Sequence, residues 1–424
     1  METKKKGFPA AFWVCACTEI FERLAYYLGR SLILIFVTAS VATGGLGLSD
    51  TVAANMQSNL TAFSYLLPLF GAVIVDKYIG ARYTTPVGMF IAAAGYFTGG
   101  IAKSSAGVYA MIFLVSLGLA LFKNGAIIGR VITDKSQMDP AFSMRYTLVN
   151  VGAFIGTFLV GILYKDVFAK DGVLGFAPCF KMAALMMVLG GLWYIFVCWR
   201  FLGDLGKLPF KKTLTEEEKA AEAKKKEETG TKQPLTTIEK KRIGAIFVAS
   251  LFSIVFWIFW YLGYMPVYFY WAENMDWVVA GYQVPSTWFD AANSLFCVIL
   301  GPVTAALWKK LAARPQGDMS LFRKTGLGIA IIGVGYLFYA AIDIMRGGEK
   351  ASVLWLIVFA FLLTMGEMFF SPLGHSFISK YSPSRYLAVM MSVWGFATFI
   401  AAKSYGPVYG LLFGGKIEFK VACI

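Results

Sequence analysis

The chain has 424 residues, of which 58% are hydrophobic and only 15% are charged. Its mean hydropathy of +0.64 excludes an ordinary soluble domain and is typical of a polytopic membrane protein. The formal net charge of +14 does not indicate a nucleic-acid-binding protein, because the basic residues form no stripe interleaved with aromatic side chains.

Apolar segments long enough to cross the roughly 30 Å hydrocarbon layer of a bilayer recur along the sequence. We predict about eleven spanning helices. They lie near 11–40, 53–75, 83–102, 106–130, 142–165, 177–201, 243–270, 284–312, 324–345, 351–377 and 386–413. Lys and Arg gather in alternate loops, a bias that places the N-terminus in the cytoplasm. The first apolar segment continues through Phe36 without a small-residue cleavage site, so we interpret it as a helix rather than a signal peptide.

The first span carries four ionisable side chains within "TEIFERLAYYLGR". At 100° per residue, these residues and two tyrosines share a sector of roughly 140° of the helix. The residues of this face are Glu19, Glu22, Arg23, Tyr26, Tyr27 and Arg30. Each charge at the centre of a bilayer costs roughly 2.5–3.5 kcal/mol on insertion scales. We therefore expect the face to line a polar cavity; a buried ion pair that only holds helices together is the alternative.

One polar segment, residues 202–242, separates the sixth span from the seventh. Within it, Thr215 and Glu218 form an N-capping box, and Gly230 is a natural helix end. We predict a short solvent-exposed helix here, in a cytoplasmic linker without a specific partner. The predicted domains are an N-terminal six-helix bundle at 1–201, the linker at 202–242 and a C-terminal bundle at 243–424.

Two six-helix halves around a cytoplasmic linker resemble the major facilitator architecture. The loop between the second and third spans, "GAVIVDKYIGAR", is similar to that family's G-x-x-x-D-R-x-G-R-R loop, although a charged turn would explain part of the pattern. The predicted fold class is therefore an all-α polytopic membrane protein with the major facilitator fold. The last residues, "KIEFKVACI", are too few for a twelfth span of about 20 residues. We expect the sequence to be a C-terminally incomplete version of a twelve-helix protein.

Other predicted spans contribute polar residues that are rare in a bilayer core. They are Lys123, Asn150, Asp290, Asn293 and Glu367, together with Tyr65 and Trp394. Polar groups from both halves suggest a cavity near the midplane, where transporters of this architecture bind substrate. Cations suit a carboxylate and carboxylates suit an amino group, so the set fits a zwitterionic ligand. A carboxylate that alternates between a proton and a cationic partner also suits proton coupling.

The sequence predicts no metal, nucleotide or covalent chemistry. The six Cys residues show no C-x-x-C pair and are interpreted as core residues. No G-x-x-x-x-G-K-[ST] loop is present, which argues against ATP as the energy source, and no nucleophile–base pairing indicates an enzyme. The one histidine, His375, lies near the end of the tenth span. We interpret it as a structural or solvent-facing residue rather than a pH sensor. We expect no cofactor, with protons as the coupling ion.

Several of these motifs resemble the proton-dependent oligopeptide transporters, the peptide-transporter (POT) branch of the major facilitators. "EIFER" followed by "LAYYLGR" is similar to that family's E-x-x-E-R-F-x-Y-Y-G-x-R signature. Lys123 in "LFKN" resembles its fourth-helix lysine, which is usually followed by Pro. "RYTLVNVGAFIG" resembles its fifth-helix F-Y-x-x-I-N-x-G-A signature, and "GEMFFSPLG" and "LAVMMSVWGFAT" resemble its tenth- and eleventh-helix segments.

The resemblance implies roles for individual residues. The implied proton-coupling residues are Glu19, Glu22, Arg23, Lys123 and Glu367. Of these, Lys123 and Glu367 would form a salt bridge between the bundles. Arg30 and Lys123 would orient the carboxylate of a peptide. Its amino terminus and amide would be held by Asn150, Asn293 and Glu367. Tyr26, Tyr27, Tyr65 and Trp394 would shape the side-chain pockets, with helix packing as the alternative for each aromatic. Ser371 completes the implied substrate-binding set.

The seventh span departs from the family's F-W-x-x-x-E-Q segment, because "FWIFWYL" has Tyr261 in place of the acid and Leu262 in place of Gln. In the family that acid pairs with the residue that matches Arg30. Asp290, where the family usually has Gln, adds an acid in the next span. We hypothesise that Asp290 pairs with Arg30 and that Tyr261 and Asp290 form a gate. Asn124 in place of Pro and Ser294 after Asn293 are further departures.

The leading hypothesis is a proton-coupled symporter that imports di- and tripeptides by alternating access. One alternative shares the fold but imports another small carboxylate-bearing or peptide-like solute. A non-transporting sensor or scaffold whose linker binds a cytoplasmic partner is the third hypothesis. We expect an integral protein of the plasma membrane, specifically a bacterial inner membrane. Its expected partners are small peptides and the lipid bilayer, with no nucleic acid and no obligate protein partner.

Overall fold

A computed structural model describes residues 7–132, 137–209, 220, 235–315, 319–370, 377–378, 381–383 and 386–424. The chain divides into two compact units. Unit 1 comprises Met1–Gly47 and Leu67–Thr213, and unit 2 comprises Leu48–Leu66 and Leu214–Ile424. The division passes through one helix, α2 (Asp50–Lys77), and Pro68 lies in that helix just after the boundary.

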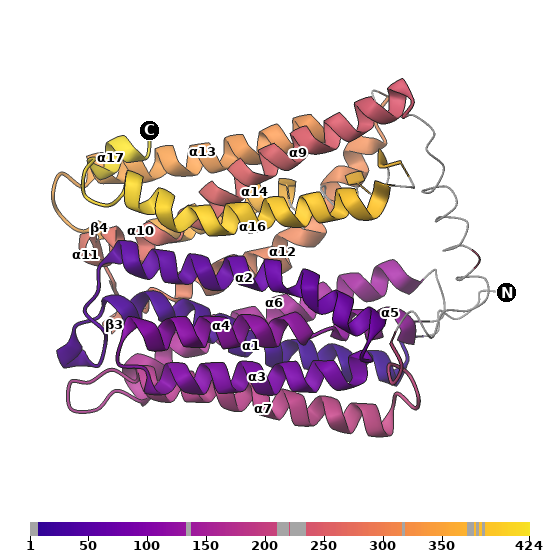
Figure 1. The fold of residues 1–424 in the computed structure, drawn as a ribbon. Coiled ribbons are helices and arrows are strands. Elements are labelled where there is room, and N and C mark those ends of the chain that lie inside the picture. The colour runs from indigo at the N-terminus through magenta and orange to yellow at the C-terminus, as the bar shows by residue number, and fades with distance from the viewer. Residues whose placement is uncertain are drawn as a thin grey trace. The chain divides into compact units, whose positions relative to one another are not determined.

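Unit 1 is built from helices that run alongside one another (Figure 1). They are α1 (Ala10–Thr38), the second part of α2, α3 (Ala81–Ile101), α4 (Ser105–Leu121), α5 (Asn124–Val131), α6 (Met138–Ile162) and α7 (Phe176–Arg200). A short 3₁₀-helix, η1 (Val41–Thr43), follows α1, and a π-helix, η3 (Leu163–Val167), continues α6.

Unit 2 contains the first part of α2 and a second set of helices (Figure 1). They are α9 (Thr237–Leu262), α10 (Met265–Tyr268), α11 (Tyr270–Asn274), α12 (Trp288–Ala312), α13 (Leu321–Met345), α14 (Trp355–Phe370), α16 (Leu387–Leu412) and α17 (Phe419–Ala422). In the part of unit 2 that the structure describes, there are also four two-residue strands. Of these, β1 (Met275–Asp276) pairs in parallel with β4 (Ala351–Ser352), and β2 (Val278–Val279) pairs antiparallel with β3 (Tyr282–Gln283).

The predicted all-α fold is confirmed, and a helix lies within each of the predicted spans. Over the described residues, 6 helices are long and apolar enough to cross a membrane, and the apolar helices Ser105–Leu121 and Trp355–Phe370 are shorter. The predicted span at 106–130 differs from the structure, because it is broken between α4 and α5. The predicted linker helix at Thr215, together with Ser371 and His375, lies outside the described residues.

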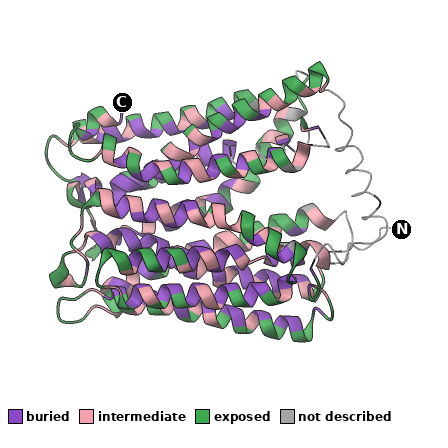
Figure 2. Ribbon diagram, in the orientation of Figure 1, coloured by how far each residue is buried: buried purple, intermediate pink, exposed green. Residues whose placement is uncertain are grey.

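Exposed residues recur along the helices of both units (Figure 2), and many of them carry large apolar side chains. Leu192, Leu251 and Val303 are 53%, 62% and 58% exposed, and many similar residues accompany them. Apolar surface in water costs about 25 cal/mol per Å² relative to burial, whereas the same surface is stable against lipid tails. Together with the long apolar helices, these faces identify the chain as an integral membrane protein.

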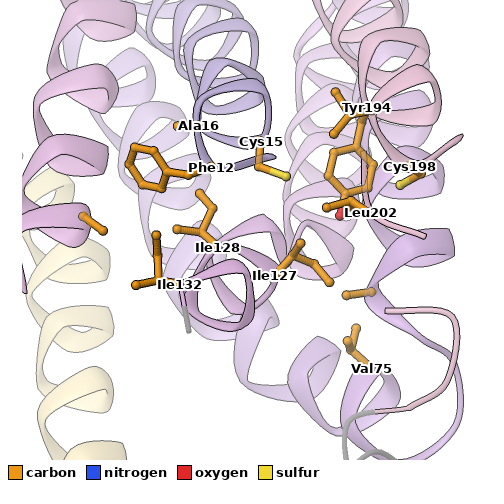
Figure 3. Packing of buried hydrophobic residues seen from close by; sticks show 13 residues of the cluster. Phe12, Cys15, Ala16, Val75, Ile127, Ile128, Ile132, Tyr194, Cys198 and Leu202 are labelled. Carbon is orange, nitrogen blue, oxygen red and sulfur yellow. The ribbon is translucent and has the colours of Figure 1, made fainter. Parts of the chain in front are cut away.

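A cluster of buried side chains joins one end of the helices of unit 1 (Figure 3). Phe12, Cys15 and Ala16 of α1 contribute to it, Ile127 and Ile128 of α5 pack there, and Tyr194 and Cys198 come from α7. All six cysteines are described and free, five of them buried, as expected for core residues. The cluster holds the start of α1 against α5, and the charged face of α1 begins directly after it.

The loop between α2 and α3 is tied to the segment that follows α7. The guanidinium of Arg82 donates to the carbonyl oxygens of Cys198, at 2.6 Å, and of Gly203, and the backbone N–H of Arg82 donates to Gly206 O at 3.1 Å. The basic residue of this predicted loop motif therefore anchors the turn.

Candidate functional site

The charged face of α1 lies largely inside unit 1. Glu19, Glu22 and Arg30 are only 2%, 0% and 5% exposed, and Arg23 and Tyr27 are half-buried. Water cannot solvate these carboxylates, so their charge must be balanced by neighbouring side chains. Arginine side chains supply this balance for Glu19 and Glu22.

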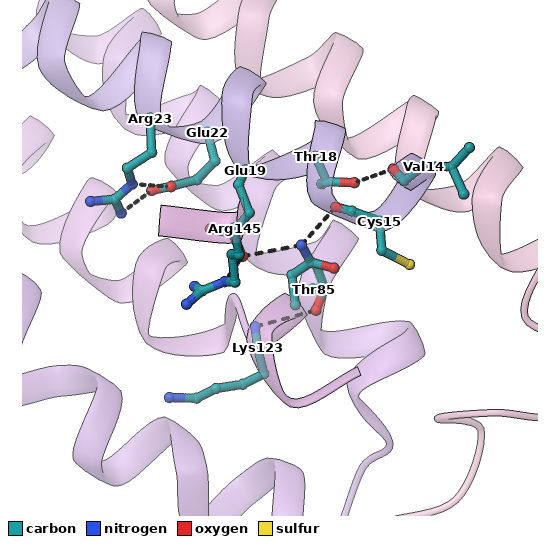
Figure 4. Close-up of polar contacts among 10 residues, drawn as sticks. Val14, Cys15, Thr18, Glu19, Glu22, Arg23, Thr85, Lys123 and Arg145 are labelled. Carbon is teal, nitrogen blue, oxygen red and sulfur yellow. Dashed lines mark hydrogen bonds and ion pairs between the residues drawn. The ribbon is translucent and has the colours of Figure 1, made fainter. Parts of the chain in front are cut away.

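Glu22 is paired with the residue that follows it in the sequence. Arg23 donates from Nη2 to Glu22 Oε1 at 2.6 Å and from Nε to Glu22 Oε2, which makes the ion pair bidentate (Figure 4). The Cζ atom of Arg23 also lies 4.9 Å from the centroid of the Tyr26 ring, in a cation–π contact. Tyr26 and Tyr27 pack edge to face, with their centroids 5.3 Å apart. The first span thus contains a compact ion pair backed by an aromatic ring.

Glu19 is held by donors from two other helices. Arg145 of α6, labelled beside Glu19 in Figure 4, donates from Nε to Glu19 Oε1 at 2.9 Å. The Asn124 amide donates to the same oxygen at 3.1 Å. Neither partner was a predicted site residue. The signal available was Arg145 at the start of "RYTLVNVGAF", but its contact with Glu19 depends on how α6 packs on α1.

Lys123 lies at the break between α4 and α5. Its backbone angles, φ −124° and ψ 31°, are not helical. Its side-chain Nζ donates to the carbonyl oxygen of Pro68 at 2.8 Å. Its backbone N–H donates to Thr85 Oγ1 at 3.3 Å, as Figure 4 shows. The break therefore places an ammonium group next to α2, near the point where that helix passes from one unit to the other.

Two glycines let α6 approach α1 closely beside the charged face. A Cβ atom on Gly152 would lie 2.9 Å from Ile20 O, and one on Gly156 would lie 2.5 Å from Leu24 O. Small residues at such positions are common where membrane helices pack. Asn150, in the same "VNVGAFIG" stretch, donates from Nδ2 to Tyr146 O of its own helix at 3.0 Å.

In unit 2, the structure brings Glu367 and Asn293 together. Asn293 Nδ2 donates to Glu367 Oε2 at 3.2 Å and to Thr364 Oγ1 at 2.9 Å. Cys297 lies on the same side, with its Sγ 3.7 Å from that carboxylate oxygen. Glu367 and Asn293 are each 8% exposed, so α12 and α14 enclose a hydrogen-bonded carboxylate that resembles the one on α1.

Tyr261, at the position of the family's acid, belongs to an aromatic cluster of unit 2. Its hydroxyl donates to the hydroxyl of Tyr65 at 3.3 Å, and its ring stacks on Tyr405 with centroids 5.0 Å apart. The Trp394 ring stacks on the ring of Phe370, with the ring centroids 6.2 Å apart. A neutral, hydroxyl-bearing cluster therefore occupies the place where a carboxylate was expected from the resemblance.

Asp290 is 6% exposed and accepts a hydrogen bond from the Tyr268 hydroxyl, within unit 2. Arg30 and Lys123 belong to unit 1, whereas Asp290 and Glu367 belong to unit 2. Each of the hypothesised pairs, Arg30–Asp290 and Lys123–Glu367, would need one residue from each unit, and both stay predictions. Among the described residues, no group of three or more His, Cys, Asp or Glu side chains could hold a metal ion.

Comparisons with known proteins agree on one class. A family model described as the POT family matches residues 205–413. An uncharacterised transporter, YclF of Bacillus subtilis (strain 168), is 25% identical over 96% of this chain and 88% of its own. A di-/tripeptide transporter of Lactococcus lactis subsp. cremoris is 24% identical over 92% of this chain and 86% of its own.

Solved structures give the same answer for the fold. A POT family transporter in complex with 5-aminolevulinic acid superposes with a TM-score of 0.84. It is 24% identical in sequence, and the match covers 99% of this chain and 94% of that one. The predicted resemblance to the POT family and the major facilitator fold are therefore confirmed, and the chain is similar to peptide transporters.

Proposed function

We propose that this chain is a proton-coupled symporter of the POT family that imports di- and tripeptides by alternating access. The observation that carries the proposal is the enclosed carboxylate in each unit. Glu19 is held by Asn124 and Arg145 in unit 1, and Glu367 is held by Asn293 in unit 2. Ionisable groups inside a membrane bundle are costly, and they mark ion or substrate pathways.

The ion pairs of α1 supply a chemical route for proton coupling. A carboxylate that binds a proton loses its charge, and a bidentate pair such as Glu22–Arg23 then loses most of its attraction. The released guanidinium is available for a different partner, such as a substrate carboxylate. Proton binding and substrate binding would be linked in this way without a further cofactor.

The substrate class follows from the charges and from the relatives. Arg30 and Lys123 would bind the carboxylate of a peptide, and Glu367 with Asn150 and Asn293 would hold its amino terminus and amide. Tyr26, Tyr27, Tyr65, Trp394 and Ser371 would complete the pocket. The relative from Lactococcus is named a di-/tripeptide transporter, and this name supports peptides as the substrate.

A second candidate substrate class rests on the aromatic cluster. Tyr261 stands where the family has an acid, and its hydroxyl donates a hydrogen bond to Tyr65. Asp290 accepts a hydrogen bond from the Tyr268 hydroxyl. The polar groups therefore differ from the implied family pattern. The similar solved structure holds 5-aminolevulinic acid, which carries one carboxylate and one amino group. Another small zwitterion is therefore the alternative to a peptide. We also expect a bacterial inner membrane with the N-terminus in the cytoplasm.

Uptake into proteoliposomes tests the proposal directly. Labelled dialanine would be added outside vesicles that carry the purified protein, under an inward proton gradient. We expect accumulation above the external concentration, and none when a protonophore collapses the gradient. If folded protein accumulates no dialanine but accumulates 5-aminolevulinic acid, the second substrate class replaces the first. If neither is taken up, the symporter proposal fails.

A further inference from the structure

The interruption of the fourth span is not caused by a proline. Phe122 has an extended backbone, φ −74° and ψ 104°, between the end of α4 and Lys123. The sequence has no proline between Pro86 and Pro140, so no missing N–H and no ring clash forces the helix to stop. Contacts with other helices must therefore maintain the break.

The Asn124 side chain makes the contacts that fit this role. Asn124 is the first residue of α5 and is 0% exposed. Its Nδ2 donates to Cys15 O at 2.8 Å and to Glu19 Oε1 at 3.1 Å, so both acceptors lie on α1. Among the described residues, its Oδ1 is buried without a hydrogen-bond partner. A buried acceptor without a partner costs free energy, and the two hydrogen bonds that the amide donates to α1 offset this cost.

We propose that Asn124 is a positioning residue, whose amide fastens the first turn of α5 to α1 and so maintains the break that places Lys123. The inference rests on the proposed function, because Lys123 and Glu19 matter there as coupling residues. The family pattern has Pro at this position, which ends a helix sterically. In this chain the break is held by hydrogen bonds to α1, and one of them ends on a glutamate of the coupling set.

This arrangement links two coupling residues through one side chain. The Asn124 amide donates a hydrogen bond to the Glu19 carboxylate. The residue before it in the chain is Lys123, whose ammonium group donates to the carbonyl oxygen of Pro68. Loss of the negative charge on Glu19 weakens the hydrogen bond that the Asn124 amide donates to its carboxylate. The backbone next to Lys123 is then held less firmly. Among the described residues, the ionisable groups that interact with Glu19 include Cys15 and Glu22 on its own helix and Arg145 on α6. Arg145 remains as a second donor when Asn124 is replaced.

Two variants and one control test the role in transport. Asn124→Leu keeps the size of the side chain and removes both donated hydrogens. Asn124→Asp keeps the shape and directs an oxygen at Glu19. We expect each to lower the maximal rate of gradient-driven dialanine uptake at least tenfold and to shift its pH profile. Thr157→Val is the matched control, because Thr157 is 0% exposed and its hydroxyl donates within α6 to Ala153 O at 2.8 Å. We expect uptake by this control within twofold of wild type.

A charge swap tests the contact independently of transport. In the double variant Glu19→Gln with Asn124→Asp, the glutamine amide becomes the donor and the aspartate becomes the acceptor. Thermal unfolding midpoints would be compared for wild type, both single variants and the double variant. We expect the double variant to unfold at a higher temperature than the sum of the two single-variant shifts gives, a non-additive result that indicates direct contact. Additive shifts would overturn the fastening role, even if Asn124→Leu proves too unstable for transport assays.

The outcomes separate this inference from the proposed function. If wild-type protein accumulates dialanine and Asn124→Leu does so with the same rate and pH profile, the inference is wrong and the symporter stands. If wild-type protein accumulates no substrate, the proposed function fails, while the swap still decides whether Asn124 fastens α5 to α1.

Discussion

Glu22 and Arg23 are adjacent in the sequence, yet they form a bidentate pair on a buried face of α1. The Glu22→Gln variant keeps the shape of the side chain but cannot exchange a proton. We expect gradient-driven uptake of dialanine to fall at least tenfold, because the proton no longer changes the pairing of Arg23. Exchange of labelled for unlabelled dialanine across the membrane, with no gradient imposed, should persist. Loss of both activities in folded protein would assign Glu22 a structural role instead.

Asp290 is the residue hypothesised to pair with Arg30 at the gate. Its carboxylate accepts a hydrogen bond from Tyr268 and is 6% exposed. If Asp290 takes over the pairing with Arg30, the Asp290→Asn variant removes an ionisable group of the gate, and the pH dependence of uptake changes. The Tyr268→Phe variant, which removes only the hydroxyl, should change it less. Transport by Asp290→Asn with an unaltered pH profile would show that the hypothesis is wrong.

At the residue scale, the sequence predicts which side chains share a face but not what they contact. The 100° period is enough to place Glu19, Glu22 and Arg23 on one side of α1. It cannot identify Arg145 or Asn124 as partners of Glu19, because these contacts depend on how α5 and α6 pack. In unit 2, Asn293 and Glu367 were implied to act on the same part of a substrate, and they are hydrogen-bonded to each other.

At the scale of elements, the approach of α6 to α1 depends on glycine. A Cβ atom on Gly156 would lie 2.5 Å from Leu24 O, a separation that requires one helix to move. We expect Gly156→Val to destabilise the protein by about 1–3 kcal/mol, the typical cost of an overpacked core. The measurement is the thermal unfolding midpoint of the purified protein. Gly326→Ala in α13 is the control, because a Cβ atom there meets nothing within 4 Å. Equal midpoints for both variants would contradict this account of the α1–α6 contact.

Element boundaries show where a hydropathy window loses information. The window predicts one span at 106–130, because the short segment from Phe122 to Gly125 contains no proline and leaves the mean hydropathy of the whole stretch high. The structure ends α4 at Leu121 and begins α5 at Asn124, through contacts that a window cannot contain. The start of α9 was predictable and was missed. Thr236 accepts from the Glu239 N–H, and Glu239 accepts from the Thr236 N–H, which is a complete capping box.

For the whole molecule, the helical architecture was predictable because each span is a long apolar segment with its own period. The assignment of helices to units was harder. The segment Leu48–Leu66, which includes the first part of α2, clusters with unit 2, although it precedes most of unit 1 in the chain. Ser58 Oγ donates to Ala402 O of α16 at 2.6 Å, and Tyr405 donates to Gln57 Oε1 at 3.2 Å. These side-chain bonds pair segments distant in sequence, and hydropathy carries no information about them.

Replacement of the polar linker separates a transporter from a scaffold. The polar segment 213–230 would be replaced by a Gly/Ser sequence of equal length, which preserves the reach of the linker and removes its charges and helix-forming residues. The charged face of α1 and the enclosed Glu367 lie outside this segment, so a transporter should keep uptake within about twofold, given that exposed linkers tolerate substitution. A scaffold whose linker binds a partner would lose that partner. Gradient-driven uptake of dialanine is the measurement, with Glu22→Gln as the inactive control. Loss of uptake in folded protein would show that the linker takes part in the transport cycle, because its sequence, and not only its length, would then be required.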